Sequence, residues 1–157
     1  MSIINMLSSS TGKRSKEINK SLAKDIVKNN DTKSVKELIM LLENKDKNIQ
    51  SDSIEVLYET GYIKPDLIAD YQETFTELLQ SKNNRLVWGA MIALSSISKI
   101  VPEIIFNALP RIQKAVDTGS VITKDAGVVV YANLSIIERQ KNDILPLILD
   151  ELEKYPD

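Results

Sequence analysis

The sequence predicts an all-α protein, an α-α superhelix formed as a short solenoid of about three and a half helical-pair repeats. Two observations predict this fold class. Apolar residues recur at helical spacing along the chain, and the pattern repeats at a step of 37 residues. The composition agrees, because aromatic residues make up only 5% and glycine and proline number five each, which suits helix packing better than a β-sandwich.

The repeat is visible in the apolar residues of successive segments. The aligned triplets are Leu38-Leu41-Leu42, Phe75-Leu78-Leu79 and Ile112-Ala115-Val116. Pro65 and Pro102 also align at this step, and each stands where the first turn of a helix is expected, the position at which proline is best tolerated. A single helical pair cannot bury its apolar faces alone, so stacking of the pairs is expected to complete the core.

The apolar pattern predicts eight helices in this order. They are a leading helix Lys16–Lys28, the pairs Thr32–Lys45 with Lys47–Thr60, Pro65–Lys82 with Asn84–Lys99 and Pro102–Asp117 with Val121–Gln140, and a final helix Asp143–Tyr155. Gly61 and Gly119 are expected to end the helices before them. Residues 1–14 are predicted to be a flexible N-terminal tail, and residues 15–157 a single repeat domain.

The composition excludes several kinds of chemistry. The chain has no cysteine and no histidine, which removes disulfides, Cys and His metal ligands, and Cys–His or Ser–His–Asp catalysis. We therefore expect no metal, no cofactor and no enzymatic activity. No apolar run approaches the roughly 18 residues of a membrane span, and Met1–Leu7 lacks the basic flank of a signal peptide, so the predicted location is cytoplasmic.

Two stretches resemble HEAT repeats, a family of helical repeat proteins related to the armadillo type. Residues 41–49 (LLENKDKNI) look like the end of an outer helix and its turn, and residues 85–94 (RLVWGAMIAL) are similar to the start of an inner helix. The resemblance covers nearly the whole chain from about Lys16 and implies a superhelix whose inner helices line a concave surface. The Asp-and-Arg ladder common in HEAT repeats is mostly lost here. Its positions read Asp46, Asn83 and Ser120, and Gln50, Val87 and Lys124.

The concave surface of such a superhelix is the expected partner-binding site. The candidates for partner contact are the outward positions Trp88, Val87, Ile92, Tyr58, Val129 and Asn133. A contiguous exposed apolar patch marks a partner site, and Trp and Tyr often dominate its energetics. The alternative for Trp88 is packing between neighbouring repeats.

The turn before the third inner helix is a second candidate. Ser120, Thr123 and Lys124 lie where free N–H groups and the helix dipole could hold an anion. The alternative is that Ser120 or Thr123 simply caps the helix.

Charge is unevenly distributed along the chain. Up to Lys36 there are eight basic residues against three acidic ones, whereas the remainder has twelve against nineteen. The lysines of the leading helix fall on one face at four-residue spacing. They are Lys16, Lys20, Lys24 and Lys28. Such a stripe can meet nucleic acid, anionic lipid or an acidic partner, or it can be the solvated face of a capping helix.

These observations favour a non-enzymatic scaffold that binds a protein or peptide on the concave face. The first alternative is a nucleic-acid-binding protein, because some HEAT-like proteins are DNA glycosylases acting on alkylated bases. Net charge −2 and only four arginines disfavour it. A second alternative is a lyase-type role, since some bacterial HEAT-like repeats resemble bilin lyase subunits, but no residue constellation supports that chemistry. A homodimer is left open.

Overall fold

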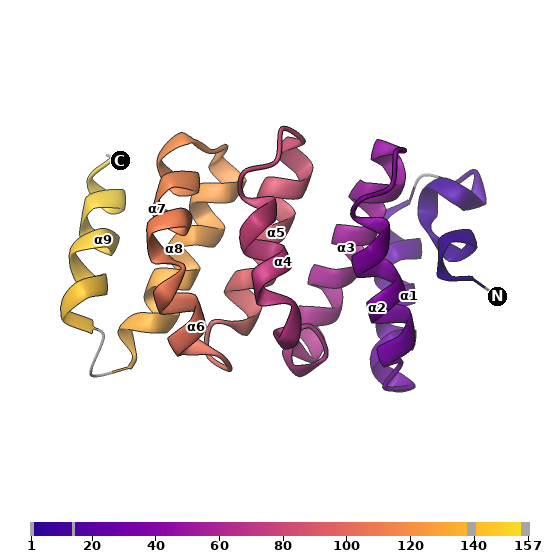
Figure 1. Ribbon diagram of the computed structural model, residues 1–157, viewed down its shortest axis with the longest axis horizontal. Coiled ribbons are helices and arrows are strands. Elements are labelled where there is room, and N and C mark those ends of the chain that lie inside the picture. Colours follow the sequence, from indigo (N-terminus) through magenta and orange to yellow (C-terminus); the bar gives the residue numbers. More distant parts are fainter. Residues whose placement is uncertain (1, 14, 138–140, 155–157) are drawn as a thin grey trace.

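The computed structural model describes residues 2–13, 15–137 and 141–154, and this part of the chain is all-helical (Figure 1). The α-helices are α1 (Lys16–Lys28), α2 (Thr32–Leu41), α3 (Lys47–Ile63), α4 (Gln72–Leu78), α5 (Asn84–Ile97), α6 (Pro102–Asn107), α7 (Leu109–Thr118), α8 (Val121–Ser135) and α9 (Lys141–Glu153). Four short 3₁₀ helices accompany them: η1 (Ile3–Met6), η2 (Ser8–Thr11), η3 (Pro65–Leu67) and η4 (Ala69–Tyr71). The predicted all-α class is confirmed.

The helices lie in a row that follows the order of the chain (Figure 1). The most extensive contacts join α1 to α3, α3 to α5, α5 to α8 and α8 to α9. A second set of helices packs on this layer, α2 against α3, α4 against α5 and α7 against α8. The layer of α1, α3, α5 and α8 therefore brings residues far apart in the sequence onto one face.

Side-chain caps define where the longer helices begin. Each accepts a hydrogen bond from a backbone N–H of the first turn: Ser15 from Glu17, Asp31 from Ser34, Asp46 from Asn48, Asn83 from Arg85, and Ser120 from Thr123. Such caps satisfy donors that have no partner inside the helix. The predicted starts of α1, α2, α3, α5 and α8 are confirmed.

Two glycines allow the helices to approach closely. A Cβ at Gly89 of α5 would lie 2.7 Å from Ile54 Cγ1 of α3, and a Cβ at Gly127 of α8 would lie 2.3 Å from Val116 Cγ2 of α7. Both distances are shorter than real Cβ contacts. Fully buried side chains such as Phe75 fill the core between the layers.

Two of the outer helices were predicted as continuous, and both are interrupted in the structure. The predicted Pro65–Lys82 helix is replaced by η3, η4 and the short α4, because the backbone leaves helical values at Ile68 and Tyr71. The predicted Pro102–Asp117 helix breaks at Ala108 into α6 and α7. Pro110 lacks the N–H that a continuous helix would need there to bond the carbonyl of Phe106.

The predicted end of the first inner helix at Gly61 is also wrong. α3 continues to Ile63, and Gly61 is buried inside it, where a Cβ would lie 2.5 Å from Ser96 Oγ of α5. Gly61 thus serves close packing rather than helix termination. Gly119 does follow the end of α7, as expected.

The N-terminal segment lies against the domain. η1 packs on α2 and η2 on α3, and Ile3 and Leu7 are buried in the common core. The packed structure therefore begins ahead of the boundary predicted at residue 15, and residues 2–13 differ from the expected tail in this respect. The predicted helix Val121–Gln140 is too long, since α8 ends at Ser135 and a turn follows at Ile136. Gln140 itself and the predicted end of the last helix at Tyr155 lie outside the described residues.

Candidate functional site

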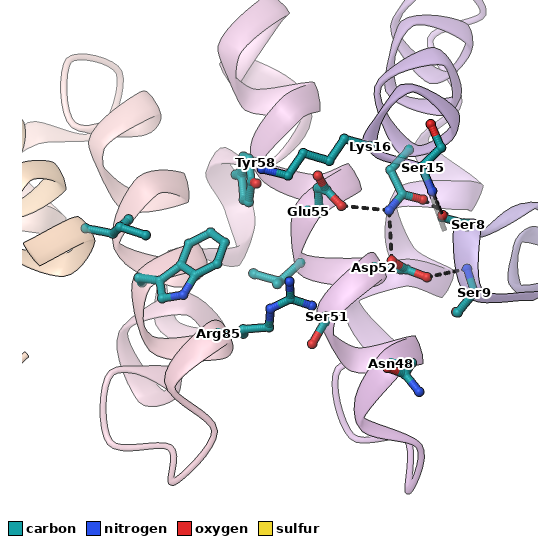
Figure 2. A pocket seen from close by; sticks show the side chains of 14 residues that line it. Ser8, Ser9, Ser15, Lys16, Asn48, Ser51, Asp52, Glu55, Tyr58 and Arg85 are labelled. Atoms are coloured by element: carbon teal, nitrogen blue, oxygen red, sulfur yellow. Dashed lines mark hydrogen bonds between the residues drawn. The ribbon is translucent and has the colours of Figure 1, made fainter. Parts of the chain in front are cut away.

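A cleft of about 330 Å³ lies on the face formed by α1, α3, α5 and α8 (Figure 2). It is lined by Ser8, Ser9, Ser15, Lys16, Asn19, Asn48, Ser51, Asp52, Ile54, Glu55, Tyr58, Arg85, Trp88 and Ile122. These residues come from η2, from the residue that caps α1 and from the four helices of one layer. The fold thus gathers segments more than a hundred residues apart around a single hollow.

α1, α5 and α8 contribute their N-terminal portions to this cleft. Lys16 and Asn19 belong to the first turn of α1, Arg85 and Trp88 to the beginning of α5, and Ile122 to the first turn of α8. The positive ends of several helix dipoles therefore point to the same side of the molecule. The N-cap side chains accept hydrogen bonds from N–H groups of these first turns. The helix dipoles therefore affect a ligand mainly through their electrostatic field and less through free N–H donors.

A buried asparagine organises one wall of the cleft. Asn19 is 1% exposed, and its Nδ2 donates to Asp52 Oδ1 at 2.9 Å and to Glu55 Oε2 at 2.7 Å. Its Oδ1 accepts from the backbone N–H of Ser8 at 3.0 Å. The backbone N–H of Ser9 donates to Asp52 Oδ2 at 2.7 Å. The carboxylates of Asp52 and Glu55 are therefore engaged by groups of the protein itself, as the dashed lines in Figure 2 show.

Aromatic rings form another part of the cleft. The rings of Tyr58 and Trp88 have centroids 6.0 Å apart at an interplanar angle of 52°, and Tyr62 meets Tyr58 edge-on at 5.9 Å. Burial, reinforced by the charge of Glu55, raises the pKa of the Tyr58 hydroxyl. Trp88 is only partly buried, which leaves part of its indole available on the cleft side.

Two basic side chains border the cleft without an ion-pair partner among the described residues. Figure 2 shows Lys16 reaching toward Tyr58, and Arg85 of α5 lines the same cleft. Neither side chain forms a hydrogen bond or salt bridge with any other residue in the described part of the chain. Lys16 acts on Glu59 at longer range. Partial burial raises the pKa of the Glu59 carboxyl, and the charges of Lys20 and Lys16 oppose that rise.

The predicted partner-contact residues are distributed unevenly. The structure brings Tyr58 and Trp88 together in the cleft, although Tyr58, like Val87, is only 8% exposed and both belong to the core rather than facing outward as expected. Ile92 is partly buried against the core, while Val129 is 47% exposed on α8.

Asn133, the sixth of these candidates, is engaged within the protein. Its Nδ2 donates to the carbonyl of Ser95 at 3.1 Å and to Ser98 Oγ at 2.8 Å. It therefore ties α8 to the end of α5. Its predicted role in partner contact stays a prediction.

The candidate anion-binding turn is a helix cap in this structure. Ser120 Oγ accepts from the backbone N–H of Thr123 at 3.5 Å and lies 3.3 Å from Thr123 Oγ1. Thr123 is fully buried and Lys124 is half-buried. The capping alternative accounts for Ser120 and Thr123, and the geometry supplies no independent sign of an anion.

Sequence reasoning missed the polar half of the cleft. The predicted contacts did not include the polar residues Asn19, Asp52, Glu55 and Arg85, and they also did not include the apolar Ile122. Asn19 offered one usable signal, since it lies three and four residues before Leu22 and Ala23 and therefore shares the apolar side of its helix, apart from the lysine stripe that begins at Lys16. A polar residue at such a position needs a hydrogen-bond partner when it is buried.

Two absences hold for the part of the chain that the structure describes. It contains no cluster of three acidic side chains placed to hold a metal ion. Likewise, none of the described helices has both the length and the apolar character needed to cross a bilayer.

Comparison with known proteins adds information on the fold. No protein-family model matches the chain, and no curated protein matches it. Among solved structures it is similar to an engineered protein, known from its crystal structure, with a TM-score of 0.65 and 19% sequence identity. The match covers 95% of this chain and 66% of the engineered one, so the chain spans slightly less than two thirds of that protein's length. At this identity the likeness shows a shared helical fold and nothing about function.

Proposed function

We propose that this protein is a non-enzymatic binding module, a short HEAT- or armadillo-like solenoid that holds a protein or peptide segment in the cleft between α1, α3 and α5. The 37-residue repeat and the neighbour-to-neighbour contacts of α1, α3, α5 and α8 support the solenoid. In such an architecture each repeat adds one helix to a common surface, and that surface carries the binding residues.

The observation that carries the proposal is the position of Trp88. This partly buried side chain lines a cleft of about 330 Å³, beside the ring of Tyr58, and the polar residues Asn19, Asp52 and Glu55 line the same cleft. Amphipathic rings of this kind bury large areas on binding at low entropic cost, and they recur at the energetic centres of interfaces. The volume suits a few side chains of an extended segment.

The alternative of nucleic-acid binding receives less support from the same face. Of the residues that line the cleft, only Lys16 and Arg85 are basic, and the carboxylates of Asp52 and Glu55 lie beside them, so the cleft offers too few cations for the continuous row of phosphates of a nucleic acid. The lysine stripe of α1 remains the surface on which that alternative would rest. A homodimer stays a prediction.

The test is selection from a displayed library of random twelve-residue peptides, with the wild-type protein as target. Enriched peptides are then titrated against two variants. Ser51→Tyr fills the cleft with a ring, whereas Lys114→Tyr adds the same ring at an exposed site on α7. Both variants are first checked for helical content by circular dichroism.

The proposal expects peptides that bind the wild type and Lys114→Tyr equally and bind Ser51→Tyr at least about tenfold more weakly, the loss typical of a blocked central contact. Equal binding to all three proteins would place recognition elsewhere. Failure to enrich any peptide would remove the support for a peptide-binding cleft.

A further inference from the structure

We propose that the segment held in this cleft is acidic: a carboxylate lies between Lys16 and Arg85, and a neighbouring apolar side chain packs on Trp88 and Ile122. This inference rests on the proposed function and specifies its ligand. The partner class is therefore an acidic–apolar stretch of a polypeptide.

The first argument is that the acidic side chains of the cleft have hydrogen-bond partners within the protein, whereas the basic side chains have none among the described residues. Both oxygens of Asp52 and one oxygen of Glu55 accept hydrogen bonds from Asn19 and from the Ser9 backbone, at 2.7–2.9 Å. Lys16 and Arg85 have no such partner among the described residues. These hydrogen bonds leave the negative charges of Asp52 and Glu55 in place, but they fix both carboxylates to Asn19 and η2, whereas the cationic groups of Lys16 and Arg85 keep their donors for a ligand.

The second argument is the direction of the basic groups. Lys16 and Arg85 come from α1 and α5, on opposite sides of α3, and both extend over the cleft in Figure 2. Arg85 presents a planar fork that matches a carboxylate with two parallel hydrogen bonds, and Lys16 adds a point charge from the other side. Together they can hold one carboxylate or two adjacent ones.

The third argument is the field of the helices. α1, α5 and α8 contribute first-turn residues to the cleft, so the positive ends of their dipoles favour an anion there. The helix dipoles contribute positive potential to the cleft, as Lys16 and Arg85 do, and they offset part of the negative potential of Asp52 and Glu55.

The fourth argument is the apolar rim beside the cations. Ile122 is 47% exposed at the start of α8, and the partly exposed indole of Trp88 lines the same cleft. A segment that carried charge alone would leave these surfaces in water. An apolar residue next to the acidic one would cover them.

The experiment uses three tryptophan-free peptides that share one Leu/Phe scaffold and differ only in four positions, occupied by Glu, Gln or Lys. Trp88 is the only tryptophan of the protein, so its fluorescence reports directly on the cleft. Titrations are run at 50 and 500 mM NaCl and repeated by calorimetry. The cleft variant Lys16→Glu/Arg85→Glu is matched by Lys114→Glu/Lys33→Glu, a reversal of two exposed lysines on α7 and α2.

We expect the Glu peptide to bind at least about tenfold more tightly than the Gln peptide, and to lose most of that preference at 500 mM NaCl as exposed charges are screened. The cleft reversal should switch the preference to the Lys peptide, while the control reversal should keep the wild-type order. All four substituted positions are exposed, so the fold is expected to persist in both variants.

Two results would separate this inference from the proposed function. If the Gln or Lys peptide binds best and shifts the Trp88 emission, the cleft is a peptide site but the acidic ligand is wrong. If the Glu peptide binds with no loss in the cleft reversal, the assignment to Lys16 and Arg85 is wrong. If no peptide of the three, and none from the random library, perturbs Trp88, the proposed function and this inference both fail.

Discussion

The side-chain amide of Asn19 donates a 2.9 Å hydrogen bond to Asp52, and this bond joins α1 to α3. The same amide bonds Glu55, so one buried residue of α1 holds two carboxylates of α3. Without it these carboxylates would lie close together with no donor between them, and the backbone N–H of Ser8 would lose its acceptor.

Replacing Asn19 by leucine is expected to lower the free energy of unfolding by about 2–3 kcal/mol, since it leaves charged acceptors and a buried N–H unsatisfied. Urea denaturation followed by circular dichroism measures the change. Asn107→Leu, at an exposed position of α6, is the control and should cost less than about 0.5 kcal/mol. Equal losses in the two variants would contradict the role assigned to Asn19.

Gly127→Ala should destabilise the protein by about 1–3 kcal/mol through overpacking, although alanine is the better helix former by roughly 1 kcal/mol. The new Cβ would stand 2.3 Å from Val116 Cγ2. Thermal and urea denaturation show whether the substitution lowers or raises the free energy of unfolding. In a Val116→Ala background the clash disappears, and Gly127→Ala should then be neutral or stabilising. A stabilising effect in the wild-type background would show that α7 and α8 can separate without cost.

Acid should weaken the cap of α2. Hydrogen bonds from the Ser34 hydroxyl and backbone N–H hold the pKa of Asp31 below its ordinary value of 3.8. Because the folded-state pKa lies below the unfolded one, the contribution is present above about pH 4 and is lost as the pH falls through the folded value.

Asp31→Ala should therefore cost about 1 kcal/mol at pH 6, the usual value of an N-cap, and less at pH 2.5. Urea denaturation at the two pH values provides the comparison. Ser34→Ala, which removes the hydroxyl donor, should reduce this pH dependence. A difference between wild type and Asp31→Ala that stays constant with pH would rule out the linkage.

Tyr131→Phe should change stability by less than about 0.5 kcal/mol or raise it, because a hydroxyl that bonds nothing costs free energy to bury. Tyr131 is 1% exposed, and its hydroxyl has no hydrogen-bond partner among the described residues. Thr60→Val is the contrast, since Thr60 Oγ1 donates to the Val56 carbonyl at 2.7 Å, and it should lose about 1 kcal/mol. A loss of that size in Tyr131→Phe would indicate a buried water bound to the hydroxyl.

The sequence predicted the helical class and the starts of the capped helices because those features are local. Side-chain caps act within three residues of the helix start, and apolar periodicity needs only one turn of context. The interruptions at Ile68 and Ala108 were missed for a different reason. Pro110 forbids a continuous helix but does not say whether the chain bends, and packing against neighbouring helices decides that.

The cleft was predictable in its aromatic part and unpredictable in its polar part. Trp88 stood out as the only tryptophan, and Tyr58 shared its predicted face. The pairing of Asn19 with Asp52 spans 33 residues. Arg85 becomes a candidate ligand contact only because it lines the same cleft as Lys16 of another helix. Such relationships depend on how helices are placed, which no local pattern contains.

The contacts between successive helices in chain order have a consequence for folding. The main tertiary contacts join elements close together in the chain, so little loop entropy is lost before they form, and folding is expected to be fast for a chain of this length. An arrangement of this kind also unravels from its ends. Amide hydrogens of α9, which packs chiefly on α8, should exchange with solvent sooner than those of α5, which is held between α3 and α8. The cleft lies between α1 and α5, so a ligand bound there would slow exchange first in the N-terminal half.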